Sequence, residues 1–307
     1  MQDFKHIPVL FYETVDALNI RPDGIYVDCT AGGGGHSSAV AEKLTTGKLI
    51  SIDQDPEAIE VLKKRFEGNP NVVVVHDNFV NIKSVLNNLG IIGVDGVMAD
   101  LGVSSHQLDT DARGFSFHKD APLDMRMSMS GVSAADIVNN APESELRRII
   151  YTYGEEKFAP SIARNIVKSR EIKPIETTFE LVDIIKASMP MKAKRDGHPA
   201  RKTFQALRIE VNQELEKLEK ALDDMFEVLN PSGRLAIITF HSLEDRMVKK
   251  RFNSFCEGCT CPPQFPVCVC GKTPRGTLPF KSKAPSVNEV DENFRAHSAR
   301  LRAVEKL

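Results

Sequence analysis

The sequence of 307 residues lacks any apolar run that approaches the roughly 18 residues needed for a membrane-spanning helix. Its first residues, Met1 to His6, include charged side chains and contain no apolar stretch typical of a signal peptide. Internal repeats and low-complexity tracts are also missing. Basic charge is not in excess, because the formal net charge is -2. These absences predict a cytoplasmic protein without a membrane partner. A nucleic-acid partner remains open, because a local basic patch is enough to bind phosphates.

Cysteine is almost absent outside one short segment, since five of the six cysteines fall between Cys256 and Cys270. In a reducing compartment, such a cluster indicates a metal site before it indicates disulfides. Two short thiolate pairs joined by a tight loop can satisfy tetrahedral Zn²⁺. We therefore predict a structural zinc site at Cys259, Cys261, Cys268 and Cys270, with Cys256 as the spare cysteine. The alternative is a loop whose cysteines stay reduced and half buried.

The chain length suits one large domain that carries a second, smaller one. Apolar strands alternate with helical patterns through the first hundred residues, which is typical of a parallel sheet covered by helices. The expected strands are 24–29, 48–53, 72–76 and 94–101, and a helix is expected at 56–66.

After Ser105 the alternation stops, and residues 106–130 have a loop-like composition. Helices follow at 143–151 and 157–169, and a third begins at Thr177, where Glu180 completes a capping box. Apolar residues at helical spacing from Val211 to Leu229 predict one long helix. Strands are then expected at 234–240 and, as a final edge strand, at 299–304. We predict an α/β domain formed by residues 1–105 and 211–307, with a helical domain, residues 106–210, inserted into it.

A glycine-rich loop joins the first expected strand to the first helix, from Asp28 to Ser37. Glycines there let the backbone approach a ligand and present N–H groups at a helix N-terminus. The pattern is Asp-x-Thr-x-Gly-x-Gly rather than the dinucleotide pattern, because Ser37 stands where the third glycine would be. An acidic residue such as Asp28 suits the ammonium group of a methionyl cofactor and would repel a pyrophosphate. The alternative is a plain glycine-rich turn.

Polar residues also end the next two strands. Asp53 ends the second, where a carboxylate can accept both ribose hydroxyls of a nucleotide. His76 to Phe79 close the third, where polar groups can bind an adenine amino group while Phe79 packs on the ring. Alone, Asp53 would more often be a helix cap and Phe79 ordinary core. Three strand ends in order, each suited to part of one adenosine, favour a single site at the carboxyl edge of the sheet.

The fourth strand ends at Asp100, which is followed by a tight polar turn. Methyl transfer to an exocyclic amine needs hydrogen-bond acceptors at this place, because the amine lone pair is delocalised into the ring until its protons are drawn away. Positioning and electrostatics then supply the rate. Asp100 is the candidate catalytic residue. An equally weighted alternative is that Asp100 and Gln107 only hold the cofactor.

A series of ordered motifs runs along the chain. They are His6–Leu10, Gly34–Ser37, Asp100–Ser105, Arg113–Phe117, Pro122–Met127, Tyr153–Glu156, Thr203–Ile209 and Phe240–Asp245. In this order they resemble the RsmH (MraW) family of cytosine-N4 ribosomal RNA methyltransferases over nearly the whole chain. Two places depart from the family: Ala31-Gly32-Gly33 stand where other members carry Phe-Gly-Arg, and many members lack the cysteine-rich segment.

The resemblance implies an α/β class I (Rossmann-like) methyltransferase fold and S-adenosyl-L-methionine as the cofactor. It implies methylation of the N4 amine of a cytidine in the decoding region of bacterial 16S ribosomal RNA, with the small ribosomal subunit as the expected partner. The chain would act as a monomer or a homodimer. The implied cofactor contacts are Gly34, Gly35, His36, Asp53, Phe79, Asp100 and Gln107. The competing functions are a class I methyltransferase for another nucleobase and a ribosome-assembly factor with little turnover.

Three further patterns could indicate functional residues: a His-Ser-Asp group, a pair of phenylalanines and a basic stretch. His241, Ser242 and Asp245 could indicate a hydrolase, but Ser242 to Asp245 is better explained as a capping box that opens a helix. Phe115 and Phe117, after the fourth strand, are either core residues or rings that stack on an unpaired base, and we expect at least one near the site. The most basic stretch is a candidate for phosphate contacts. Its members are Lys192, Lys194, Arg195, Arg201, Lys202 and Arg208.

Overall fold

The computed structural model describes residues 8–191, 198–262, 264, 267 and 269–307. Some sequence-based predictions fall outside these residues, namely those for His6 and Ile7, for Lys192, Lys194 and Arg195, and for Cys268. The chain divides into two compact units, residues 1–102 with 216–307 and residues 103–215.

The first unit holds all the strands of the described chain. Its helices are α1 (Phe11–Ala17), α2 (Gly35–Ala41), α3 (Pro56–Arg65), α4 (Ile82–Asn88), nearly all of α11 (Glu214–Glu227), α12 (Ser242–Cys256) and α13 (Val287–Glu292), with short 3-10 turns at Phe79–Asn81 and Phe294–Ser298. Its strands are β1 (Ile25–Asp28), β2 (Lys48–Asp53), β3 (Val72–His76), β4 (Val94–Asp100), β5 (Leu229–Thr239), β6 (Gly276–Thr277) and β7 (Arg300–Lys306).

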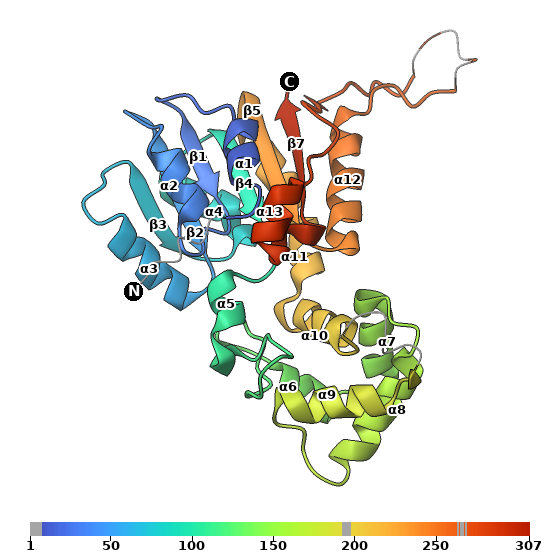
Figure 1. Ribbon diagram of the computed structural model, residues 1–307. Helices are drawn as coiled ribbons and strands as arrows, with labels where there is room; N and C mark the ends of the chain where they lie inside the picture. Colours follow the sequence, from blue (N-terminus) through green and yellow to red (C-terminus); the bar gives the residue numbers. More distant parts are fainter. Residues whose placement is uncertain (1–7, 192–197, 263, 265–266, 268) are drawn as a thin grey trace. The chain divides into compact units, whose positions relative to one another are not determined.

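These strands form one sheet in the order β3-β2-β1-β4-β5-β7-β6 (Figure 1). Strands β1 to β5 are parallel, and β7 runs antiparallel to both β5 and β6. The chain leaves β1 toward β2 and β3 and later returns to place β4 on the other side of β1. Ligands of such sheets bind at this switch point, beyond the carboxyl ends of the strands. The predicted α/β fold with a Rossmann-like parallel sheet is confirmed.

The alternation of side chains along each strand builds a core on both faces of the sheet. Val27 and Ile50 belong to a buried cluster with residues of α4, α12 and α11 (Glu214–Glu227). Tyr26 and Leu49, one position earlier on the same strands, belong to a second cluster with residues of α1 and α2. Burial on both faces is what lets a parallel sheet consist of nearly continuous apolar strands.

The parallel register brings the carboxyl ends of three strands to one edge. Asp28 pairs with Ser51 on β2 and with Met98 on β4, while Asp53 and Asp100 are the last residues of their own strands. Three aspartates that are far apart in sequence therefore end neighbouring strands of one sheet.

Two strand predictions were wrong in detail. β5 begins at Leu229 rather than Arg234, because Leu229 already pairs with Val94 before a register shift in the ladder. The strand 299–304 was expected at the sheet edge, but β7 pairs on both sides because the two-residue β6 lies beyond it.

The second unit is helical. Its elements are α5 (Ser105–Asp109), a 3-10 turn at Asp111–Arg113, α6 (Ala134–Asn140), α7 (Glu143–Gly154), α8 (Ala159–Arg170), α9 (Thr178–Ala187) and α10 (Arg201–Asn212). The predicted capping box at Thr177 and Glu180 is present. Residues 106–130 are not all loop, because a capping box between Ser104 and Gln107 opens α5.

The single helix expected from Val211 to Leu229 is broken. α10 ends at Asn212, and Gln213 adopts a left-handed conformation with φ 52° before α11 begins. The Asn212 side chain is 6% exposed and holds the loop of Met125 and Met127. Its Nδ2 donates to the carbonyl of Met125 over 2.8 Å, and its Oδ1 accepts the N–H of Met127 over 2.8 Å.

No helix in the described part of the chain is both long enough and apolar enough to cross a membrane.

Asn212→Ala should destabilise the second unit, because it leaves buried backbone groups of Met125 and Met127 without partners. Each unsatisfied group costs about 1–3 kcal/mol. Asn140→Ala is the matched control, since its exposed side chain makes one bond, to the carbonyl of Asp136. Urea denaturation should show a clear loss of unfolding free energy for Asn212→Ala and little change for the control. Equal stability of the two variants would contradict this account.

Candidate functional site

Asp28, at the end of β1, is the buried centre of the candidate site. Its side chain is 1% exposed. Oδ2 accepts the hydroxyl of Ser37 over 2.7 Å, and Oδ1 accepts the N–H of Thr30 over 3.2 Å. Ser37 is also hydrogen-bonded to Ser51, at 2.9 Å between hydroxyl oxygens. Asp28 thus fixes both ends of the loop between β1 and α2.

Two glycines in that loop are required by space and by conformation. Gly34 has φ 80° and precedes the first residue of α2, a conformation that disfavours any side chain. A Cβ on Gly35 would lie 2.4 Å from the Cγ of Pro8. The loop therefore closes tightly over the end of β1, as the sequence motif predicts.

Asp53, the last residue of β2, holds the same loop from the next strand. Its Oδ2 accepts the N–H of Gly32 over 2.7 Å, and its Oδ1 accepts the N–H of Asp55 over 2.8 Å. The cap of α3 is Asp55, whose side chain accepts the N–H of Glu57. The alternative role of Asp53 as a helix cap is therefore excluded.

Asp100, at the end of β4, is held by its backbone and has an unpaired side-chain oxygen. Its N–H donates to the Thr30 hydroxyl over 2.6 Å. Its side chain is 26% exposed, but Oδ1 is inaccessible and has no hydrogen-bond partner among the described residues. An unpaired carboxylate oxygen that is also buried is costly.

His36, the second residue of α2, lies next to Asp100. Its Nδ1 is 3.9 Å from Asp100 Oδ2, and its ring stacks on Phe11 with centroids 5.8 Å apart. Burial lowers the pKa of His36 to about 4. The ring is therefore neutral at pH 7 and does not neutralise Asp100. Its Nε2 is also buried without a hydrogen-bond partner within the described ranges.

The three aspartates make the site strongly electronegative. Burial raises the pKa of Asp28 to about 6, against the lowering effect of its hydrogen bonds from Ser37 and Thr30, and the charge of Asp53 raises it further. Burial also raises the pKa of Asp53. Burial, followed by repulsion from Asp28 and Glu244, raises the pKa of Asp100 well above its ordinary value. Such a site favours a cation, because an opposite charge stabilises each carboxylate.

Phe79 follows β3 and is half buried, with its ring packed against the core cluster of the sheet. Asn78, just before it, donates from Nδ2 to the side-chain oxygen of Gln54 over 2.6 Å. A polar side chain and a partly buried aromatic side chain therefore follow β3, beside the end of β2. Core packing therefore accounts for the partial burial of the Phe79 side chain. Its contact with a cofactor ring stays a prediction.

Gln107 belongs to the second unit and is 5% exposed. Its Oε1 accepts the N–H of Ser104 over 3.1 Å, and its own N–H donates to the Ser104 hydroxyl over 3.2 Å. Its side chain thus caps α5, and its contact with a cofactor remains a prediction.

Several side chains of the site were not singled out from the sequence. Thr30 and Ser37 position the backbone of Asp100 and the carboxylate of Asp28, and Glu244 adds negative charge near Asp100. The Asp-x-Thr spacing was the available signal for Thr30. Glu244 gave no signal, because its burial at 2% exposure depends on the tertiary fold.

The helix after β5 has a capping box, but the predicted cap residue was wrong. His241, not Ser242, is the N-cap of α12, and its box partner is Glu244. Both residues of the box are buried, and Glu244 Oε2 accepts the N–H of Phe240 over 3.0 Å. The structural interpretation of this motif therefore holds, shifted by one residue.

Phe115 and Phe117, the two candidates for stacking on a base, have different surroundings in the second unit. Phe115 is 6% exposed and belongs to the core of the unit. Phe117 is half buried and stacks on His198, with centroids 4.4 Å apart and planes inclined by 16°. Burial lowers the pKa of His198, so this pair is an uncharged stack.

The described residues of the basic stretch, Arg201, Lys202 and Arg208, also differ in their contacts. Arg201 is exposed and forms no ion pair with any described residue, and Lys202 Nζ donates to the Glu155 carbonyl over 3.0 Å. Arg208 instead forms a two-bond ion pair with Glu214, at 2.8 and 2.9 Å. Arg201 and Lys202 are therefore the better candidates for phosphate contacts.

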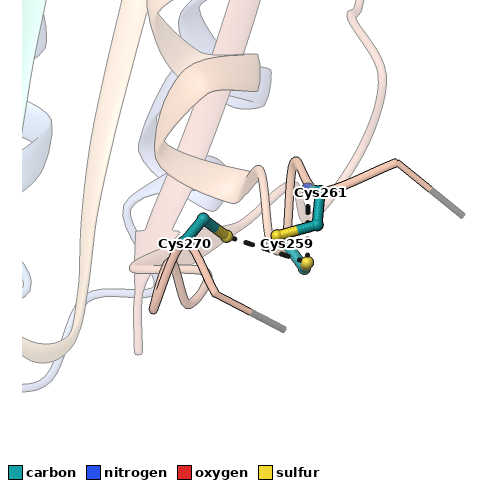
Figure 2. Close-up of side chains that lie close together, drawn as sticks. All are labelled: Cys259, Cys261 and Cys270. Atoms are coloured by element: carbon teal, nitrogen blue, oxygen red, sulfur yellow. Dashed lines mark hydrogen bonds between the residues drawn. The ribbon is translucent and has the colours of Figure 1, made fainter. Parts of the chain in front are cut away.

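The cysteine-rich segment brings three of the predicted ligands together. The Sγ atoms of Cys259, Cys261 and Cys270 all lie within 4.8 Å of one another (Figure 2). Cys256 is not part of this group and packs against the core of the sheet.

Comparison with known proteins gives a consistent result. The sequence model of the MraW methylase family matches residues 3–307. A protein of Clostridium botulinum named ribosomal RNA small subunit methyltransferase H is 55% identical over 99% of this chain and 100% of its own length. A protein of Lachnospira eligens with the same name is 53% identical over 100% of this chain and 99% of its own. A solved rRNA methylase from Streptococcus thermophilus superposes with a TM-score of 0.44 at 12% identity, covering 98% of this chain and 99% of the other. The family match spans nearly every residue, and the chain therefore belongs to the MraW methylase family.

Proposed function

We propose that this chain transfers the methyl group of S-adenosyl-L-methionine to the N4 amine of a cytidine in the decoding region of 16S ribosomal RNA, within the small ribosomal subunit. Family membership and the names of its relatives support methyl transfer to small-subunit ribosomal RNA. The observation that carries the proposal is the group of buried carboxylates at the ends of β1, β2 and β4, with one oxygen of Asp100 left unpaired.

The donor set fits this cofactor. When bound, S-adenosylmethionine supplies a methyl group on a positively charged sulfur, and the electronegative site stabilises that charge. Asp53 accepts the ribose hydroxyls with the lone pairs that Gly32 and Asp55 leave free. Asp28 is too enclosed for direct contact and acts through its charge. Gly34 and Gly35 allow the loop to approach the ligand closely.

Asp100 is the candidate for the chemical step. The accessible part of its side chain, which is 26% exposed, accepts a hydrogen bond from the target amine, which draws the lone pair out of conjugation with the ring. After transfer the amine must lose a proton, and a carboxylate with a raised pKa is a competent acceptor. The neutral ring of His36 beside it leaves this acceptor unneutralised.

The substrate is bound by the second unit in this proposal. Exposed Arg201 and Lys202 contact phosphates, and the stacked Phe117 and His198 present a flat surface to an unpaired base. Gln107 adds a cofactor contact from the start of α5.

One experiment tests the proposal as a whole. The protein is incubated with labelled cofactor and small ribosomal subunits from a strain that lacks the gene, and the modified nucleotide is mapped. Methylation at N4 of a single decoding-region cytidine is the expected result. A label on another base would support a different nucleobase as substrate, and tight binding without turnover would support an assembly factor.

Asp53→Ala should weaken cofactor binding, since each hydrogen bond that it removes contributes about 1–3 kcal/mol. Asp95→Ala is the matched control. Asp95 also accepts a backbone N–H, that of Ile25 over 2.8 Å, but it lies near the start of β4. Calorimetry should show weaker binding for the first variant alone. Unchanged affinity in Asp53→Ala would remove Asp53 from the ribose site.

Asp100→Ala should abolish methyl transfer, and Asp100→Asn should keep a little activity, because an amide oxygen still accepts a hydrogen bond. In the wild type, kcat should increase with pH as Asp100 loses its proton, and this limb should be missing from the Asn variant. Both variants are assayed at saturating cofactor. Near-normal kcat with only weakened cofactor binding would leave Asp100 as a cofactor ligand.

The double variant Arg201→Ala, Lys202→Ala should bind small subunits more weakly and with a shallower salt dependence, because each lost phosphate contact removes about 0.7 from the slope. Cofactor affinity should not change. Lys249→Ala, Lys250→Ala is the control, an equally exposed cation pair on α12 of the first unit. The same salt slope in both double variants would place the RNA surface elsewhere.

A further inference from the structure

Between α12 and β6, the described residues 257–262, 264, 267 and 269–274 are not held in place by apolar packing. None of them is buried. The base of this segment is closed where the N–H of Arg275 donates to the Phe255 carbonyl over 2.8 Å. The Arg275 guanidinium also lies over the rings of Phe226 and Phe255, at 5.5 and 5.2 Å from their centroids. Beyond this base, the entropy cost of ordering the segment has no apolar burial to offset it.

Three thiols nevertheless converge in this exposed segment. Cys259 and Cys261 lie on one side of it and Cys270 on the other, and Figure 2 shows the three sulfur atoms gathered at one place. They lie within 4.8 Å of one another. Convergence of exposed side chains across a loop without packing indicates that a bound group holds them together.

The distance between sulfurs fits a metal and not a disulfide. Cys259 Sγ and Cys270 Sγ are 3.7 Å apart. Two thiolates at tetrahedral positions around Zn²⁺, each with a bond of about 2.3 Å, are separated by about 3.8 Å. A disulfide would need about 2.05 Å between the sulfurs.

Backbone groups around the sulfurs favour thiolates. The N–H of Cys261 donates to Cys259 Sγ over 3.4 Å, and the N–H of Val269 donates to Cys261 Sγ over 3.4 Å. Hydrogen bonds of this kind stabilise negative charge on ligand atoms and fix their orientation. Gly271, directly after Cys270, has φ 60°, which lets the chain turn away sharply behind the sulfur.

Cys256 differs from these three in its surroundings. It is the last residue of α12, it packs against the sheet core, and burial raises the pKa of its thiol. The structure therefore separates Cys256 from the three converging cysteines, although it is only three residues from Cys259.

We propose that Cys259, Cys261 and Cys270 bind one Zn²⁺ as thiolates, and that this ion ties Cys270 to the stretch that holds Cys259 and Cys261. Soft thiolate ligands in a tetrahedral arrangement favour zinc over harder divalent ions. Binding releases the thiol protons and changes no oxidation state. The role is structural, and the proposal is independent of the methyl-transfer reaction.

The test uses the full chain purified without chelator. Elemental analysis should find about one zinc per chain. The variant Cys259→Ser, Cys261→Ser, Cys270→Ser should lose the zinc, while Cys256→Ser should keep it. Trypsin gives a second readout, because Lys272 lies inside the segment. Cleavage after Lys272 should be slow in the zinc-loaded protein and fast after chelation or in the triple variant.

Three outcomes would overturn the proposal. The first is wild-type protein, grown and purified with zinc available, that holds none. The second is zinc retained by the triple variant. The third is a mass two hydrogens lower than expected, with a disulfide mapped between Cys259 and Cys270. Binding of cofactor by the triple variant controls for its folding.

Discussion

Repulsion among buried carboxylates is the constraint around which the first unit is organised. Parallel strands end at one edge, so Asp28, Asp53 and Asp100 cannot avoid one another once β1, β2 and β4 pair. The surrounding groups reduce this cost: the Ser37 hydroxyl and the Gly32 N–H each donate to one of these carboxylates. These hydrogen bonds do not remove all of the repulsion between the carboxylates. A cationic ligand would reduce the remaining repulsion, so the site favours ligands with positive charge.

The same repulsion couples the two halves of the proposed reaction. A cation bound at this edge lowers the pKa of Asp100, which favours the charged carboxylate. His36 cannot substitute for that cation, because burial keeps its ring neutral. In the proposed function, cofactor binding therefore favours the form of Asp100 that acts on the target amine.

The elements that were predicted correctly depend on local sequence patterns. The wrong predictions concern features that depend on contacts between residues far apart in the sequence. Strand ends such as Asp53 and Asp100 follow directly from an apolar run closed by an acidic residue. The break at Gln213 was hidden because apolar residues continue at helical spacing through it, while Asn212 is used by a distant loop. The cap of α12 was misplaced by one residue, since only the fold shows that His241 accepts the N–H of Glu244. β6 has only two residues, which is too short for an alternation of apolar and polar residues to predict a strand. The site residues followed from strand ends, but their mutual electrostatics could not be read before they were brought together.

The position of β7 has a consequence for how the sheet is assembled. β7 ends at Lys306, whose Nζ donates to the carbonyls of Glu227 and Leu229 where α11 passes into β5. Residues 103–215 form a compact unit by themselves, so they can fold while translation continues. The sheet differs, because β5 and β7 follow residues 103–215 in the sequence while β1 to β4 precede them. The sheet, with its group of carboxylates, is therefore assembled from residues on both sides of the helical unit.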